Sequence, residues 1–271
     1  MSRALPCCFV LALAAAPALA NAAPVLDTFT LQLGAYSYKL DANIRVNGTA
    51  TQVQGSNLDF SRDLGLDSGH DNPSVVVSWR PFTQHEFGFS YFGDSQKATR
   101  VTGRTFNFLG HEFPVGANLR AQAYYDVYGL TYTWWGWLQE ESALGIVGGL
   151  YDYRYGLTLD ASFQAGGNTA ERHGKAESNS LAGALGVSWR RRLGEHARLF
   201  ADAGGLKANI DGVSQWMWTA NLGIDYLPWE HFGLRAQYSG NRIYSEIDAN
   251  HFDGDMRFAF TGLQLMGIVR F

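Results

Sequence analysis

The strongest constraint on this chain is an alternation of apolar and polar residues with a period of two, repeated along most of its length. In "WTANLGIDY", Trp218, Leu222 and Ile224 lie on one face, and Asn221 and Asp225 lie on the other. Successive side chains of a β-strand point to opposite faces, so this period is typical of strands whose two faces meet different surroundings. The pattern therefore predicts an all-β protein.

Short and long polar connections alternate between these segments. The four short connections contain Pro81, Glu140, Gly194 and Glu230. The longer ones, rich in Gly, Asn, Asp and Ser, are 46–72, 93–116, 164–179 and 250–255, with a shorter one near Asp211. Bacterial outer-membrane barrels have short periplasmic turns and longer external loops. We therefore predict a transmembrane antiparallel up-and-down β-barrel.

The number of strands follows from placing the four short turns on the periplasmic side. We predict about ten strands, with eight or twelve as alternatives, and both termini in the periplasm. "TATQVQGSNLDF", within 46–72, either forms an extra external hairpin or adds two strands, and "FNFLGHEF" predicts another external hairpin. The predicted strands are 28–46, 73–81, 85–101, 117–137, 142–160, 179–192, 197–210, 214–228, 232–247 and 257–271.

The first residues predict export. A short cationic start is followed by the apolar run "CCFVLALAAAPALA", with small residues at the spacing of a cleavage site. We predict a signal peptide over 1–22, with cleavage between Ala20 and Ala23, and a single barrel domain over 23–271. Cys7 and Cys8 are the only cysteines, so the mature domain has no disulfide, and the formal net charge of -4 gives no reason to expect nucleic acid.

The apolar faces place aliphatic residues in mid-strand and aromatic residues towards the strand ends. Aromatic rings favour the headgroup level of a bilayer, so this order predicts apolar faces that point outward to lipid. The alternative is that these aromatic residues belong to an ordinary core. The predicted girdle near the short turns contains Trp79, Trp135, Trp189, Tyr226 and Trp229.

The chain ends in "TGLQLMGIVRF", which alternates up to its last residue. In hydrocarbon every backbone group needs a partner, so the last strand must close against the first. Leu263, Leu265, Val269 and Phe271 are predicted to face lipid.

With its signal peptide, unequal connections and final Phe, the chain resembles the bacterial outer-membrane β-barrel family of small barrels. The resemblance covers the whole mature chain. It implies that Gly262 to Phe271, with Leu263, Leu265, Val269 and Phe271, forms the signal recognised by the barrel-assembly machinery. Gly267 departs from the family, in which a bulkier apolar residue is commoner. "DFSRDLGLD" and "HEFPVGA" are similar to pieces of uncharacterised proteobacterial members.

If the apolar faces meet lipid, charged residues must lie inside the barrel and pair there, because unpaired buried charges are costly. We also expect Phe92, Leu130, Met266 and Ile268 to point inward, which favours a filled lumen over a pore. The charge cluster is then either structural or part of a gated ion path. The predicted cluster contains Arg80, Glu86, Asp126, Arg190, Asp202, Asp225 and Arg235.

Two acidic stretches with a histidine, "DLGLDSGHDN" and "DANHFDGD", are the candidates for chemistry in the external loops. They would serve acid–base catalysis or hold a hard cation, or they are solvated turns. The twelve-residue Ca²⁺ loop pattern, a Gly-Xaa-Ser-Xaa-Gly elbow, HExxH and a phosphate loop are absent, so we expect no catalytic residue, metal or cofactor. The candidate loop residues are Asp67, His70, Asp71, His251, Asp253 and Asp255.

Taken together, the sequence favours a non-enzymatic outer-membrane barrel with a structural or surface-interaction role. The alternatives are an enzyme acting on lipid A, phospholipid or peptide at the outer rim, and a small pore for ions or solutes. The expected partners are outer-membrane lipid, lipopolysaccharide and the assembly machinery. We expect a monomer.

Overall fold

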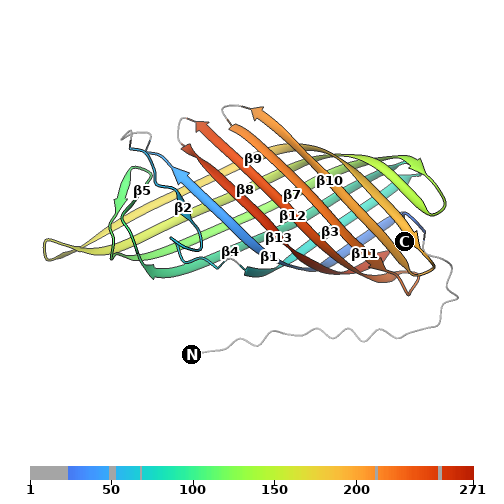
Figure 1. The fold of residues 1–271 in the computed structure, drawn as a ribbon, viewed down its shortest axis with the longest axis horizontal. Helices are drawn as coiled ribbons and strands as arrows, with labels where there is room; N and C mark the ends of the chain where they lie inside the picture. Colours follow the sequence, from blue (N-terminus) through green and yellow to red (C-terminus); the bar gives the residue numbers. More distant parts are fainter. Residues whose placement is uncertain (1–23, 49–52, 68, 211–212, 250–251) are drawn as a thin grey trace.

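The computed structural model describes residues 24–48, 53–67, 69–210, 213–249 and 252–271. Ten long antiparallel strands form a closed barrel in which β13 pairs with β1 (Figure 1). Within these residues no helix is long and apolar enough to cross a membrane. The barrel strands are β1 (Phe29–Val46), β3 (Gly69–Phe82), β4 (His85–Val101), β7 (Asn118–Leu138), β8 (Ser142–Ala165), β9 (Asn168–Leu193), β10 (Ala197–Ile210), β11 (Val213–Tyr226), β12 (Phe232–Ala249) and β13 (Phe252–Arg270).

Three further strands are short and lie outside the ring. β2 (Leu58–Asp59) pairs with β1 at Asn43 and Ile44, beyond the start of β3. The described residues between β1 and β3 therefore add no further strand to the barrel, although β3 begins at Gly69, inside the predicted loop 46–72. β5 (Phe106–Phe108) and β6 (His111–Phe113) form the hairpin predicted from "FNFLGHEF". Its turn residues Leu109 and Gly110 have φ angles of 54° and 75°, the left-handed pair that a two-residue hairpin turn requires.

The predicted strands match the observed ones, except at the end of the barrel away from the short turns. The predicted loop 164–179 is wrong, because β8 continues to Ala165 and β9 begins at Asn168, joined by Gly166 and Gly167. β13 likewise begins at Phe252, inside the predicted loop 250–255. The β8–β9 hairpin projects beyond its neighbours in Figure 1. The predicted signal peptide lies outside the described residues.

β1 shows how the surroundings of the strands change along the barrel. Near the short turns, Leu33 faces outward and is exposed, whereas Thr30 and Gln32 are buried inside. Beyond Ala35 the same two faces exchange character: Tyr36, Tyr38, Leu40, Ala42, Ile44 and Val46 are buried, and Ser37, Lys39, Asp41 and Asn43 lie on the outward face. The strand keeps its phase while the polarity of each face reverses.

Other strands repeat this reversal, which divides the barrel into two parts. We use "apolar band" for the part next to the short turns, where outward residues such as Leu222, Leu234 and Leu265 are exposed. We use "loop half" for the part beyond it, where inward residues such as Leu119, Leu159 and Phe260 are buried. An outer-membrane barrel presents an apolar band of this kind to lipid. The prediction that Leu222, Ile224 and Leu265 point outward is confirmed.

The barrel closes where its two terminal strands meet. The backbone N–H groups of Thr28 and Phe29 donate to the carbonyl oxygen of Phe271 at 2.8 and 2.9 Å. The Phe271 N–H donates in turn to the carbonyl oxygen of Phe29 at 2.9 Å. The final strand is therefore paired up to its last residue, as a closed wall requires.

Candidate functional site

The lumen of the apolar band ends, at the short turns, in a cluster of paired charges that we call the floor. It consists of Asp27, Arg198, Asp225, Arg235 and Arg270. Asp225 is fully buried, and its carboxylate accepts hydrogen bonds from Arg198 Nη2 at 2.9 Å and from Arg235 Nε at 2.6 Å. Two guanidinium groups thus share one carboxylate.

Asp27 connects this pair of arginines to the last strand. Its two carboxylate oxygens accept bonds from Arg198 Nη2 at 2.8 Å and from Arg270 Nη1 at 3.0 Å. Asp27 precedes β1, Arg198 lies on β10 and Arg270 on β13, so the floor joins distant parts of the ring. Buried charges are tolerated when they are paired and hydrogen-bonded in this way.

Residues 24–28, which we call the strap, form part of this closure at the mouth of the barrel. Arg80 donates to the carbonyl oxygens of Asp27 and Leu26 at 3.1 and 3.2 Å. Arg198 donates to the carbonyl oxygen of Val25 at 3.2 Å. Val25 and Leu26 also pack with the buried Trp135. The strap is held by arginines from the wall and by apolar contact.

The other predicted cluster residues divide into those inside and one outside. Arg190 and Asp202 pair inside the barrel at 2.6 Å, and Glu86 accepts a bond from Trp135 Nε1 at 3.1 Å. Asp126 was wrongly placed in the lumen: it lies on the outer face of β7, where Tyr91 donates to it at 2.9 Å. It belongs to the loop half, whose outer face carries polar residues.

Two more predicted orientations on β7 are wrong, because the prediction exchanged the inward and outward faces of this strand. Leu130 shares the outward face of Asp126 and is 61% exposed. Trp135, predicted in the girdle, points inward and is only 1% exposed. The pairing of β7 with β8 shifts register between Trp134 and Trp137, which lets both of these tryptophans face outward with Trp135 between them facing inward.

The remaining girdle and closing-strand residues face outward. Trp79, Tyr226 and Trp229 are exposed, and the half-buried Trp189 donates to Ser142 Oγ at 3.2 Å. Leu263, Leu265 and Phe271 are exposed on the outer face of β13, and Val269 shares that face.

Above the floor lies a cavity of about 310 Å³. Hydroxyl and amide side chains line much of its wall, including Gln32, Ser78, Thr131, Asn221 and Gln237. A volume of this size lies at the lower end of the range for small-molecule sites. It is also polar enough to hold water.

Aromatic rings close this cavity on the side of the loop half. Phe92 packs edge-on against Tyr36 and Phe260, with ring centroids 6.1 and 5.9 Å apart. Asn72 Nδ2 donates to the Tyr38 hydroxyl at 2.8 Å, and that hydroxyl contacts Tyr125. This layer satisfies its few polar groups internally.

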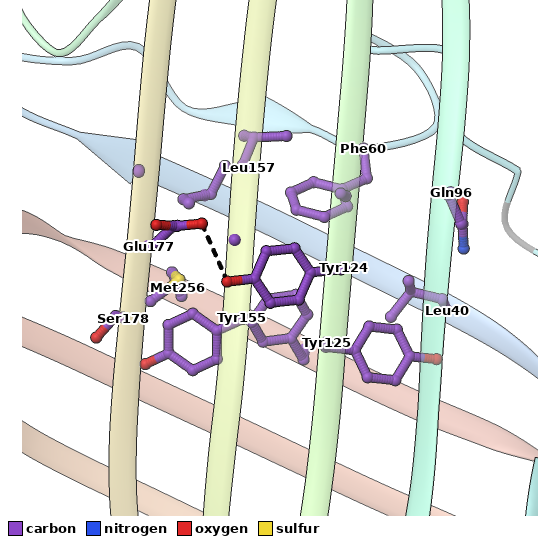
Figure 2. Close-up of a pocket in the computed structure, with 15 residues that line it drawn as sticks. Leu40, Phe60, Gln96, Tyr124, Tyr125, Tyr155, Leu157, Glu177, Ser178 and Met256 are labelled. Carbon is purple, nitrogen blue, oxygen red and sulfur yellow. Dashed lines mark hydrogen bonds between the residues drawn. The ribbon is translucent and has the colours of Figure 1, made fainter.

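Beyond the aromatic layer the loop half is packed with apolar side chains. A space of about 20 Å³ is left beside Leu40, Tyr155 and Leu157, enough for little more than one water (Figure 2). Outside it, Tyr124 lies over Gly156 and donates to Glu177 at 3.2 Å.

The segment of β2 and the β5–β6 hairpin complete this packing from the open end. Phe60, Leu64 and Phe108 join the same buried apolar cluster as the strand residues. Phe108 rests against Gly174 of β9, where an added Cβ would come within 2.7 Å of the ring. Arg104 fixes the β2 segment by bonds to Asp63 at 2.9 Å and to the carbonyl oxygen of Asn57 at 2.7 Å.

The Asp63 carboxyl, in the loop half, has a lowered pKa. Burial by itself would raise this pKa, but hydrogen bonds and positive charge from Arg104 outweigh it, so the pKa lies below its usual value.

The loop candidates Asp67, Asp253 and Asp255 each have a separate partner. Asp253 accepts a bond from Asn47 Nδ2 at 3.0 Å, Asp255 pairs with Arg45, and Asp67 accepts from the backbone of Gly69 at 3.1 Å. Among the described residues, no group of three or more potential metal ligands comes together. Asp71 is exposed on β3, the His70 side chain is not described, and His251 lies outside the described residues.

Sequence reasoning missed Asp27, Arg198 and Arg270. The signal for Arg198 was present, because it alternates in phase with Asp202, which was assigned to the lumen. Arg270 likewise shares the face of Met266 and Ile268, which are buried inside as predicted. Asp27 precedes the first strand, where no alternation indicates the direction of a side chain.

No family model matches the chain, and neither does any curated protein. Among solved structures, the outer-membrane protease OmpT from Escherichia coli matches with a TM-score of 0.56 and 11% identity, over 90% of this chain and 96% of that chain. Neisserial surface protein A matches with a TM-score of 0.27, 12% identity and shares of 90% and 97%. The Pseudomonas putida toluene transporter TodX matches with a TM-score of 0.38 and 10% identity, over 90% of this chain and 89% of that chain. The OmpT likeness shows a shared barrel fold and carries no assignment of activity.

Proposed function

We propose that this chain is an integral protein of the bacterial outer membrane, with a structural or surface-interaction role and no catalytic activity. The reversal of polarity along the strands carries the proposal. In a soluble barrel the exposed Leu33, Leu222 and Leu265 of the apolar band would face water, which is unfavourable. In an outer membrane, acyl chains would cover them. The short turns would then lie in the periplasm and the loop half outside the cell.

The closures of the lumen support a non-conducting role. The floor and strap close one end, and the aromatic layer with the apolar packing of the loop half closes the other. An ion would have to cross a layer that holds Phe92 and Phe260, whose rings offer no replacement for its hydration shell. The loop half would serve as a rigid platform presented beyond the membrane.

Three measurements test this proposal. Protein refolded in detergent should migrate differently on a gel with and without boiling, because a closed barrel resists the detergent until heated. In planar bilayers it should show no steady conductance, and peptide and lipid A incubated with it should remain intact. Identical mobility in both gel lanes would overturn the barrel in the membrane, and stable conductance or hydrolysis would overturn the closed, non-catalytic role.

A gated pore is the second candidate, favoured by the polar cavity of about 310 Å³ directly above the strap. In that case removal of residues 24–27 should produce conductance in the same recordings. The closed-barrel proposal expects the shortened chain to remain silent, because the aromatic layer at Tyr36, Phe92 and Phe260 is unchanged.

A further inference from the structure

One side of the outer wall, immediately beyond the apolar band, carries interleaved cations and aromatic rings. Strand pairing places Lys207, Trp216, Tyr244 and Arg257 in one row across β10, β11, β12 and β13. The neighbouring row, one step closer to the band, contains Trp218 opposite Arg242. We call these six residues the cation wall.

The cation wall faces outward, and two of its three cations, Arg242 and Arg257, lie over aromatic rings. The Arg242 guanidinium lies 5.9 Å from the centre of the Trp218 ring, and that of Arg257 lies 5.1 Å from the centre of the Tyr244 ring. Lys207, Arg242 and Arg257 are exposed. Within the described residues none of the three takes part in an ion pair, whereas Arg45 nearby is paired with Asp255.

The adjoining stretch of outer wall, on β7, β8 and β9, carries cations beyond the band that are paired with carboxylates. Arg154 pairs with Asp152 at 2.7 Å, and Lys175 pairs with Glu177 at 2.9 Å. Asp126 lies directly across from Arg154. The two stretches of wall therefore differ in available positive charge, although both border an apolar band.

The band ends directly below the cation wall. On β12 the exposed Tyr238 is followed on the same face by Gly240 and then Arg242. On β11, Leu222 and Ala220 lead to Trp218. A molecule with acyl chains along Leu222 and Leu263 would thus place its headgroup at these cations. Among the described residues, the acids nearest this area are Asp41 on β1, Glu246 on β12 and Asp255 on β13. Asp255 lies two residues from Arg257 on the same face and is paired with Arg45.

We propose that the cation wall binds the phosphorylated sugar headgroup of an outer-leaflet glycolipid of the lipid A class. Arg242, Arg257 and Lys207 would contact phosphate, since guanidinium and ammonium groups form strong charge-assisted bonds with it. Trp216, Trp218 and Tyr244 would lie at the headgroup level, where aromatic rings are favoured. This inference rests on the proposed location in the outer membrane and adds a defined site to it.

The test compares binding of bis-phosphorylated lipid A and its dephosphorylated form to full-length protein refolded in detergent. The double variant Arg242→Gln/Arg257→Gln is compared with the control Arg154→Gln/Lys175→Gln, which makes the same change of charge on the adjoining stretch of wall. We expect the double variant to bind bis-phosphorylated lipid A at least about tenfold more weakly, and the control to stay within about twofold. The dephosphorylated lipid should bind all proteins equally weakly.

Three outcomes would overturn the site. The first is an equal loss of lipid A binding in both variants, and the second is equal binding of the two lipids by the unmodified protein. The third is that inorganic phosphate competes as well as bis-phosphorylated lipid A does, which would indicate a free-anion site. Gel mobility with and without boiling is measured on every variant. If the unmodified protein fails to show heat-dependent mobility, the proposed barrel fails; if all variants keep it and lipid binding does not change, only this inference fails.

Discussion

Leu222 on β11 and Leu159 on β8 are both leucines of long strands in one barrel, yet Leu222 is 61% exposed and Leu159 is completely buried. The first lies in the apolar band and the second in the loop half. The phase of the strands does not change between the two parts; the solvent outside them does. In the band the outer face would meet acyl chains and the inner face holds Asp225 and Arg235. In the loop half the outer face is polar and the inside is a core.

The comparison separates what alternation determines from what depth determines. The period of two determines which residues share a face of the strand. Whether that face is apolar depends on what surrounds it, which is lipid, water or the interior of the barrel. A strand such as β9, with 26 residues, is far longer than the roughly ten residues that cross an outer membrane. The part of β9 in the loop half therefore has a polar outer face and an apolar inner face, as in a soluble barrel. The same charged substitution on the outer face should then be costly in the apolar band and tolerated in the loop half.

The largest effect is expected from Asp225→Ala in the floor. The change leaves Arg198 and Arg235 without their shared buried carboxylate, which should lower the free energy of unfolding by about 3–5 kcal/mol. The measurement is urea unfolding in detergent followed by gel mobility. Asp152→Ala, which removes an exposed partner of Arg154 in the loop half, should cost no more than about 1 kcal/mol. Equal losses would show that the floor is as well solvated as the outer wall.

The next effect is expected from Leu222→Arg, which places a charge on the lipid-facing side of the band. Its cost should be about 2–4 kcal/mol if the residue lies near the bilayer midplane. Thr99→Arg puts the same side chain on the outer face of β4 in the loop half, where residues are exposed to water, and should be nearly neutral. Folding into vesicles at increasing urea compares the two. A costly Thr99→Arg would place the membrane boundary further along the strands than the polarity reversal indicates.

The same comparison explains which parts of the structure could be predicted from the sequence. β1, β4 and β10 were predicted to within one residue, because alternation and turn residues are local signals. The lumen pairs Arg190–Asp202 and Asp225–Arg235 follow from the same signal. The orientation of Asp126 and the strand residues 168–178 were missed because a polar outer face was taken to mean lumen or loop. Asp27 depends on contacts with Arg198 and Arg270, which lie more than 170 residues away along the chain.

A third prediction concerns the interior of the loop half. Gly174→Val would place a side chain against the ring of Phe108, which already lies 2.7 Å from the position of an added Cβ. Overpacking should cost about 1–3 kcal/mol and release the β5–β6 hairpin to protease. Gly148→Val on β8 is the matched control in the band, where the nearest atom to an added Cβ belongs to Leu185 at 3.8 Å. A harmless Gly174→Val would mean that the hairpin is not seated on β9.

The smallest effect is expected from pH acting on Asp63, which binds the β2 segment to Arg104 in the loop half. The pKa of this carboxyl is lowered in the folded protein, so its contribution to stability is complete above the ordinary carboxyl value of about 4. That contribution declines as the pH falls through the folded pKa and is absent below it. Because Arg104 is half exposed, the difference should be less than about 1 kcal/mol. Unfolding measured at pH 2.5 and at pH 6 should show this difference in the unmodified protein and not in Asp63→Asn. An identical pH dependence in both would assign the effect to other carboxylates, with those of the floor as the next to examine.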